Sequence, residues 1–122
     1  MPRLAILLIA LGTGCSPVPV GFDSPAKTKR MDAIVRAAAE NDTSPRTIRC
    51  IIQELDSHDP AVRFIAIRTL ERLTGQTNGY DFAALDWDRE ASVQAWVRWF
   101  HDTYPEHSTP VVIDELADTT HE

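Results

Sequence analysis

A single apolar spacing returns in three segments between residues 27 and 104. Hydrophobic side chains stand at i, i+3, i+4 and i+7, and about 3.6 residues per turn bring these positions onto one face of an α-helix. These segments cover residues 31–38, 48–55 and 93–100, and a broader apolar segment covers residues 62–73. None of this region alternates apolar and polar residues as a half-buried strand does. We therefore predict an all-α fold of about four helices and no sheet.

The segment over residues 62–73 differs from the other three because it is apolar on two sides. Val62, Ala66 and Leu70 line one side, and Phe64 and Ile67 add the other. A helix that is apolar on two sides is covered by neighbours on both. We expect this helix at the centre of the domain.

Residues that begin and end helices flank these segments. Ser44 and Asp59 each precede a proline, which places a capping side chain before a proline at the first helical position. Gly75 follows the third segment and tolerates the left-handed conformation that ends many helices. We expect Asp86 or Asp88 to cap the last helix.

Residues 1–14 have the composition of a secretory signal peptide. Arg3 precedes an apolar run over residues 4–11, and small residues follow at Gly12 and Gly14. The apolar run is far shorter than the ~20 residues that a membrane-spanning helix needs. We predict removal of residues 1–14 and a mature chain that begins at Cys15.

The same segment resembles a bacterial lipoprotein signal, in which a small residue precedes a cysteine that is acylated. Gly14 and Cys15 match the end of that motif. The resemblance implies lipid, including palmitate, on Cys15 and an anchor facing the periplasm. Ser16 stands where an inner-membrane retention signal often has aspartate, which favours the outer membrane. Residues 15–26 hold three prolines and are expected to form an extended linker.

Ordinary signal cleavage is the alternative to acylation. Gly12 and Gly14 also form the small-x-small pattern of such a site. Cleavage without acylation would give a soluble periplasmic or secreted protein.

The net charge of the chain is negative, but the helical region is almost neutral. Residues 27–104 hold 12 acidic and 11 basic side chains. Residues 105–122 hold five acidic side chains and no basic one, which is typical of a disordered, solubilising tail. A neutral domain provides no positive field for a phosphate backbone, so we expect no nucleic-acid partner.

Residues 59–66, DPAVRFIA, followed by Leu70 and Leu73, resemble the second helix of a HEAT repeat. Residues 48–55 fit the first helix of that repeat, and residues 31–38 would be the remaining helix of a degenerate repeat before it. The stretch after residue 73 is similar to the end of short bacterial HEAT-domain proteins of the cell envelope. The resemblance implies a short α-solenoid of roughly two repeats over residues 27–104, used to bind proteins.

In the HEAT family, an arginine near the start of this helix is a ladder residue that pairs with an acid in the preceding turn. The resemblance assigns this role to Arg63, with Asp56 and Asp59 as candidate partners. Asp59 is also expected to act as a plain N-cap, since it directly precedes Pro60.

Aromatic residues around the last helix are candidates for contact with a partner. The long loop over residues 75–88 is expected to pack its apolar side chains back on the helices. Trp96 lies on the apolar stripe and is assigned to the core, whereas Trp99 either packs under the loop or anchors a partner. The candidate docking residues are Trp99, Arg98, Tyr80 and Trp87.

Residue types that perform catalysis or bind metals are not brought together by their spacing. Cys50 is expected to be a half-buried thiol. If Cys15 is not acylated, Cys50 could instead form a disulfide with Cys15. His58, the nearest histidine, falls in a turn, whereas a catalytic thiol needs an adjacent base. The alternating acids within residues 86–90 lack the glycine and downstream glutamate of an EF-hand. We expect no catalytic residue, metal or cofactor.

These observations predict a non-enzymatic adaptor of the bacterial cell envelope, tethered through Cys15. A stack of about two repeats leaves one face of each terminal helix uncovered, where a protein partner could dock. The alternative is a structural subunit that completes a larger envelope assembly, by pairing with itself.

Overall fold

The computed structural model describes residues 19–108. The predicted signal peptide, Cys15 and most of the acidic tail lie outside this range. Residues 19–108 contain no strand, which confirms the all-α prediction. The elements are α1 (Lys27–Glu40), α2 (Pro45–Glu54), α3 (Pro60–Thr74), α4 (Asp86–Thr103) and the short 3₁₀-helix η1 (Pro105–His107).

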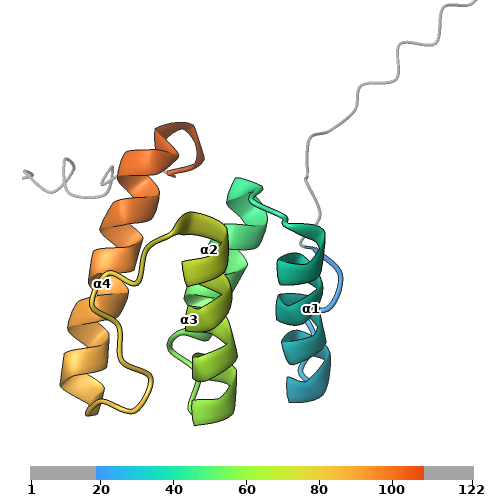
Figure 1. Ribbon diagram of the computed structural model, residues 1–122, viewed down its shortest axis with the longest axis horizontal. Coiled ribbons are helices and arrows are strands. Elements are labelled where there is room, and N and C mark those ends of the chain that lie inside the picture. Colours follow the sequence, from blue (N-terminus) through green and yellow to red (C-terminus); the bar gives the residue numbers. More distant parts are fainter. Residues whose placement is uncertain (1–18, 109–122) are drawn as a thin grey trace, which may run out of the picture.

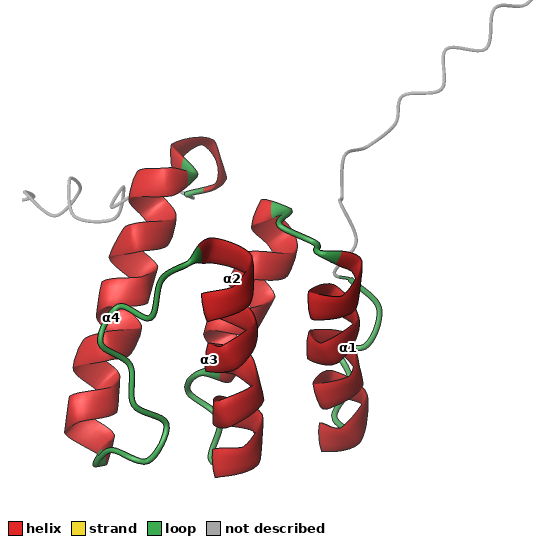
Figure 2. Cartoon of the chain, viewed as in Figure 1, coloured by secondary structure: helices red, strands yellow, loops and turns green. Residues whose placement is uncertain are grey.

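The four helices form two layers (Figures 1 and 2). Helices α1 and α3 lie side by side in the front layer, and α2 and α4 lie behind them. Helix α3 packs against α1 and α2, and α2 packs against α4. Successive helices thus alternate between the layers, as they do in a short solenoid.

The loop over residues 75–85 occupies the next place in the front layer, beside α3 and in front of α4 (Figure 1). The ring of Phe82 packs edge-to-face on Phe64 of α3, with centroids 5.0 Å apart. On the other side, the Ser92 hydroxyl of α4 donates to the carbonyl of Gly79 at 3.2 Å. This loop therefore joins α3 to α4.

The ends of α3 follow the sequence signals. The Asp59 carboxylate accepts a hydrogen bond from the backbone N–H of Ala61 at 2.8 Å, so Asp59 is the predicted N-cap. Gly75 ends the helix with a φ of 74°, in the left-handed region. Both assignments are confirmed.

Two predicted caps differ from the structure. Ser44 stands at the N-cap of α2, but its hydroxyl donates to Thr47 Oγ1 at 3.0 Å instead of accepting from the backbone. Helix α4 begins at Asp86 after Leu85, so neither Asp86 nor Asp88 is its N-cap. Both acids lie in the first turn, where the positive end of the helix dipole favours a negative charge.

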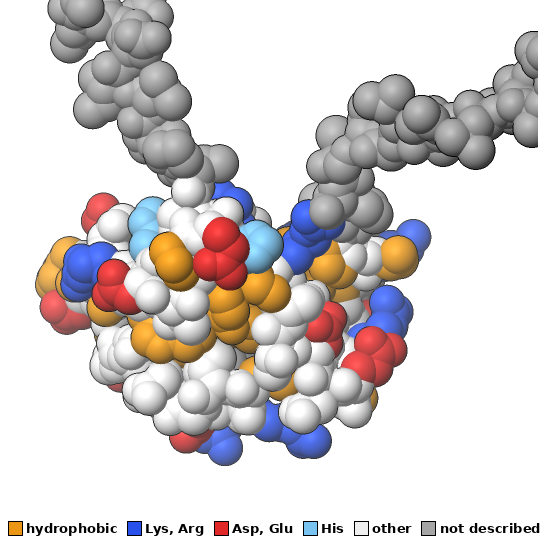
Figure 3. Space-filling view, turned by 90° about the horizontal axis from the view of Figure 1, so that it is seen from above, with side chains coloured by type: hydrophobic (Ala, Val, Ile, Leu, Met, Phe, Trp, Pro, Cys, Tyr) orange, Lys and Arg blue, Asp and Glu red, His pale blue; other side chains and the backbone are white. Residues whose placement is uncertain are grey.

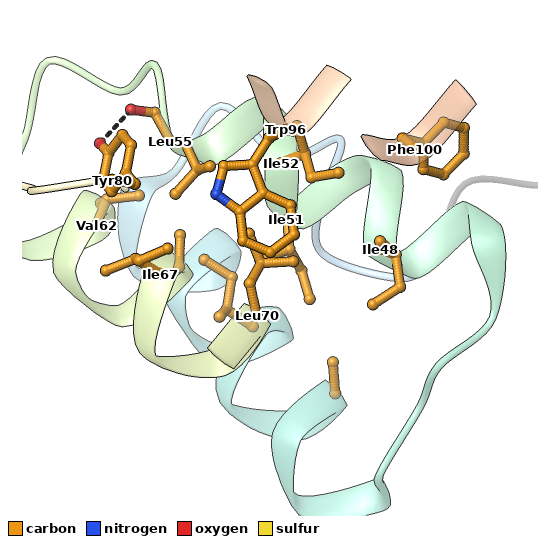
Figure 4. Packing of buried hydrophobic residues seen from close by; sticks show 13 residues of the cluster. Ile48, Ile51, Ile52, Leu55, Val62, Ile67, Leu70, Tyr80, Trp96 and Phe100 are labelled. Carbon is orange, nitrogen blue, oxygen red and sulfur yellow. Dashed lines mark hydrogen bonds between the residues drawn. The ribbon is translucent and has the colours of Figure 1, made fainter. Parts of the chain in front are cut away.

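The core lies between the layers, around the side chain of Trp96 (Figure 4). Trp96 is fully buried, and its indole N–H donates to the carbonyl of Thr77 in the loop at 3.0 Å. The whole apolar stripe of α2 is also buried: Ile48, Ile51, Ile52 and Leu55. Helix α3 is central as predicted, although of its second apolar side only Ile67 is buried and Phe64 is exposed.

Helix α1 buries most of its predicted stripe, but the buried face is turned away from Val35. Ile34 is buried and Met31 packs against the core, as predicted. In contrast, Val35 is exposed, and Ala33 and Ala37 are buried instead. The stripe is therefore centred on Ile34 and formed mostly by alanines. Alanine is common on both buried and exposed helix faces, so apolar spacing alone places the face poorly.

The described part of the predicted linker packs on the domain. Phe22 contacts the core, and Arg30 of α1 donates to the carbonyls of Ser24 and Pro25 at 2.9 and 3.0 Å. Residues 19–26 therefore do not stand off the helices as an extended spacer.

Candidate functional site

Arg63 connects three segments at one end of the stack. Its side chain is 7% exposed and donates to the carbonyls of Ser57, His58 and Phe82 at 2.8, 3.0 and 3.1 Å. The predicted ion pair is wrong: among residues 19–108, no ion pair joins Arg63 to Asp56 or Asp59. A guanidinium has five N–H donors in a fixed fork, and carbonyl oxygens satisfy them as well as carboxylates do. Arg63 thus holds the α2–α3 turn and the loop together.

Tyr80 is buried, which contradicts its assignment as a docking residue. Its hydroxyl donates to the carbonyl of Leu55 at the end of α2 at 2.6 Å (Figure 4). Burial raises the pKa of Tyr80, so the phenol remains a neutral donor at physiological pH. Its role is to fasten the loop to the core.

Asp59 joins α3 to α1 as well as capping α3. The Lys27 ammonium of α1 donates to the Asp59 carboxylate at 2.6 Å. A second pair links α1 to α2, between Arg30 Nε and Glu54 Oε1 at 3.3 Å. Asp56 remains exposed and belongs to the groove described below.

Acid should destabilise this fold as Asp42 and Asp59 become protonated. Burial alone would raise the pKa of Asp42, but hydrogen bonds from Thr47 and Ser44 lower it below 3.8. The hydrogen bond from Lys27 lowers the pKa of Asp59. Each carboxyl therefore binds its proton more weakly in the folded chain. The stability that these carboxylates contribute is complete above the pKa that each group has in the unfolded chain. It is lost as the pH falls through the lower pKa of the folded chain.

Urea unfolding at a series of pH values measures this effect. We expect the free energy of unfolding to decrease between about pH 4 and pH 2. The matched variant is Asp59→Asn, which keeps a capping acceptor but has no titrating group. Its decrease should be shallower, and an equal decrease would contradict the assignment for Asp59.

A groove of about 570 Å³ lies between the turn after α2 and the first turns of α4. Three carboxylates line it, from Asp56, Asp86 and Glu90. Two guanidinium groups also line it, from Arg63 and Arg89. Residues far apart in sequence therefore form one charged surface.

Both arginines of this groove already have partners within the chain. Arg89 donates to the carbonyl of Ala84 at 2.6 Å and to Asp86 Oδ1 at 2.5 Å. Arg63 donates to the three carbonyls described above. In contrast, no ion pair among residues 19–108 includes Asp56 or Glu90. Arg63 also forms no ion pair in this range, so three carboxylates against two guanidinium groups leave the groove with a formal charge of −1.

Two large apolar side chains stand exposed beside the start of α4. Trp87 is 67% exposed and Leu85 is 58% exposed. Both were expected to fold back on the helices with the rest of the loop, and this expectation is wrong for them. Trp87 remains accessible, as its alternative assignment as a docking residue requires. Leu85 precedes α4 at the N-cap position, and its local sequence does not mark it as exposed.

The other two docking candidates lie nearer the end of α4. Trp99 is half-buried, packed edge-to-face on Trp96 and Tyr104 with centroids 5.3 and 6.0 Å apart. Its ring contacts are therefore with another residue of α4 and with the residue that follows α4. Arg98 is exposed. Of the two, only Arg98 is fully accessible to a partner.

Cys50 is half-buried, as predicted. Burial raises the pKa of its thiol, which lowers the fraction of thiolate at neutral pH. Its alternative disulfide partner, Cys15, lies outside the described residues. Among residues 19–108, no group of three or more ligand side chains is placed to hold a metal ion.

Charges of both signs are distributed over the surface seen from above, with apolar side chains gathered near its middle (Figure 3). Within residues 19–108, no helix has the length and apolar character needed to cross a membrane. No protein-family model, curated protein or solved structure matches the chain.

Proposed function

We propose that this chain is a non-enzymatic protein-interaction module of the HEAT type that acts as an adaptor in a bacterial cell envelope. Its partner docks at the end of the stack where α4 begins. The observation behind this proposal is the exposure of Trp87, at 67%. Tryptophan is enriched among the residues that dominate binding energy at protein interfaces.

The surroundings of Trp87 support a docking role. Leu85, two residues earlier, is also exposed, so the apolar surface is larger than one side chain. The α2–α3 turn and the loop beside it are held by Arg63 and Tyr80, which fixes the surface before a partner arrives. A preformed surface loses less conformational entropy on binding than a mobile one.

The state of Cys50 supports the non-enzymatic part of the proposal. The pKa of the Cys50 thiol is raised, whereas a nucleophilic thiol is activated by a lowered pKa. Cys50 is also not among the residues that line the charged groove, whereas His58 is.

The membrane tether is a separate part of the proposal. It rests on the resemblance of residues 1–15 to a lipoprotein signal, with acylation of Cys15 and, from Ser16, the outer membrane as the destination. The chain should be recovered in the membrane fraction and should carry a diacylated or triacylated N-terminal peptide by mass spectrometry. Cys15→Ser should move it to the soluble fraction. An unmodified N-terminus in the wild-type protein would contradict the anchor and favour a soluble periplasmic or secreted form.

Site-directed photo-cross-linking in intact cells tests the docking surface. A photoreactive amino acid in place of Trp87 should give one discrete cross-linked product, which mass spectrometry identifies. The control is the same amino acid in place of Asp32, an exposed residue on α1. No product at position 87, or the same products at both positions, would contradict the proposal.

Self-association is a second candidate function, and one observation favours it. Val35 on α1 and Trp87 on α4 are both exposed, on the first and last helices of the stack. Two copies could therefore pair through apolar surfaces on different helices. Sedimentation over a range of concentrations distinguishes the candidates, because only self-association shifts with concentration. A cross-linked product containing two copies of this chain would give the same answer.

A further inference from the structure

We propose that the partner is recognised through a basic peptide segment, whose lysine or arginine enters the groove beside Trp87. The cationic head would lie near Asp56 and Glu90, and the indole of Trp87 would cover the aliphatic stem. This inference rests on the proposed docking function and adds the chemistry of the partner.

Helix geometry places Trp87 at the rim of the groove. Trp87, Glu90 and Gln94 stand at i, i+3 and i+7 on α4, and such positions share one helix face. Glu90 and Gln94 both line the groove. Trp87 does not line the groove, but it is exposed and shares a helix face with two residues that do. One occupant can therefore contact the tryptophan and the carboxylates together.

The pairing of the charges determines which ligand the groove can attract. Arg63 and Arg89 donate to carbonyls and to Asp86, whereas Asp56 and Glu90 form no ion pair within residues 19–108. Arg89 is paired with Asp86, whereas Arg63 donates only to neutral carbonyls and keeps its positive charge. Three carboxylates against two guanidinium groups leave the groove with a formal charge of −1, which favours a cation over an anion. The N-terminal end of a helix carries only about half a positive charge, which is less than the charge of these carboxylates.

Size and polarity agree with a peptide side chain. The groove volume of about 570 Å³ is within the range of about 300–1,000 Å³ that is typical of ligand pockets. Most of its lining residues are charged, which does not suit an apolar small molecule. A cation over the face of a tryptophan gains a further attraction from the ring quadrupole. The negative charge also disfavours anionic lipid headgroups as occupants.

A synthetic peptide with two arginines around one leucine tests the proposal. The full chain, in non-ionic detergent, is titrated with this peptide while tryptophan fluorescence and heat are recorded. A matched peptide has glutamates in place of the arginines. We expect saturable binding of the basic peptide that weakens with salt, and no binding of the acidic one.

Three variants locate the binding site. Trp87→Ala should weaken binding by about tenfold or more, as is usual for the loss of an anchoring tryptophan. Glu90→Gln should weaken it as well, and its matched control is Asp32→Asn, which removes one negative charge from the exposed face of α1. Asp32→Asn should leave binding unchanged.

The outcomes separate this inference from the proposed function. Equal binding of both peptides, equal loss in Glu90→Gln and Asp32→Asn, or no saturable binding would overturn the basic-peptide assignment. If a discrete cross-linked partner still appeared at position 87, the docking function would stand and only the partner chemistry would be wrong. Peptide binding without any cross-linked partner would contradict the docking function instead.

Discussion

Trp96→Ala is expected to lower the free energy of unfolding by about 3–5 kcal/mol, enough to unfold most or all of the domain. Trp96 is fully buried where α2, α4 and the loop meet, and its indole N–H is bonded to the carbonyl of Thr77. Alanine would leave a cavity in the core and a carbonyl without its donor. Urea unfolding followed by circular dichroism measures the change.

Trp87→Ala is the matched control, since it makes the same substitution on the same helix. Trp87 is exposed, so its removal should change the free energy of unfolding by less than about 0.5 kcal/mol. Equal effects of the two substitutions would contradict the assignment of Trp96 to the core and Trp87 to the surface.

Arg63→Leu should lower the free energy of unfolding by about 2–4 kcal/mol, which is the second largest effect that we expect. Leucine keeps an apolar side chain in the space of the arginine stem but donates no hydrogen bond. A charged donor would be lost from three partly buried carbonyls, those of Ser57, His58 and Phe82. Thermal unfolding followed by circular dichroism measures the loss.

Two further substitutions make this prediction specific. Arg63→Lys should retain part of the stability, because an ammonium has fewer donors and no planar fork. Arg68→Leu removes an exposed arginine of the same helix, paired with Glu71 at 2.8 Å, and should cost less than about 1 kcal/mol. If Arg63→Leu were as mild as Arg68→Leu, the three carbonyl contacts would not stabilise the fold.

The helices were predictable because each one is encoded locally. The apolar spacing marks α2 and α4, a broader apolar segment marks α3, and the boundaries at Asp59 and Gly75 follow from single residues with strong conformational preferences. The predicted stripe of α1 was right for Met31 and Ile34 and wrong for Val35, because alanines on several sides leave the spacing ambiguous. Local patterns thus predicted the elements better than their orientation.

The candidate site was less predictable because it depends on the path of the loop. Arg63 was expected to reach a carboxylate, but the folded loop brings the carbonyl of Phe82 to it. Tyr80 lies in the loop and is buried, whereas Trp87 lies in the first turn of α4 and is exposed. The loop has no periodicity from which the burial of Tyr80 could be predicted. The groove likewise combines residues 56–63 with residues 86–94, which only the fold brings together.

The alanine-rich contact of α1 has a mechanical consequence. The side chains that α1 buries are two alanines and one isoleucine, so it buries much less apolar surface than α2 does. In a stack whose elements hold only their neighbours, an end element can detach while the remainder stays intact. A pulling force applied at the N-terminal end would first detach residues 19–26 and would then have to break the Lys27–Asp59 and Arg30–Glu54 pairs of α1. The domain would then unfold in two steps, and the part built around Trp96 would unfold at the higher force.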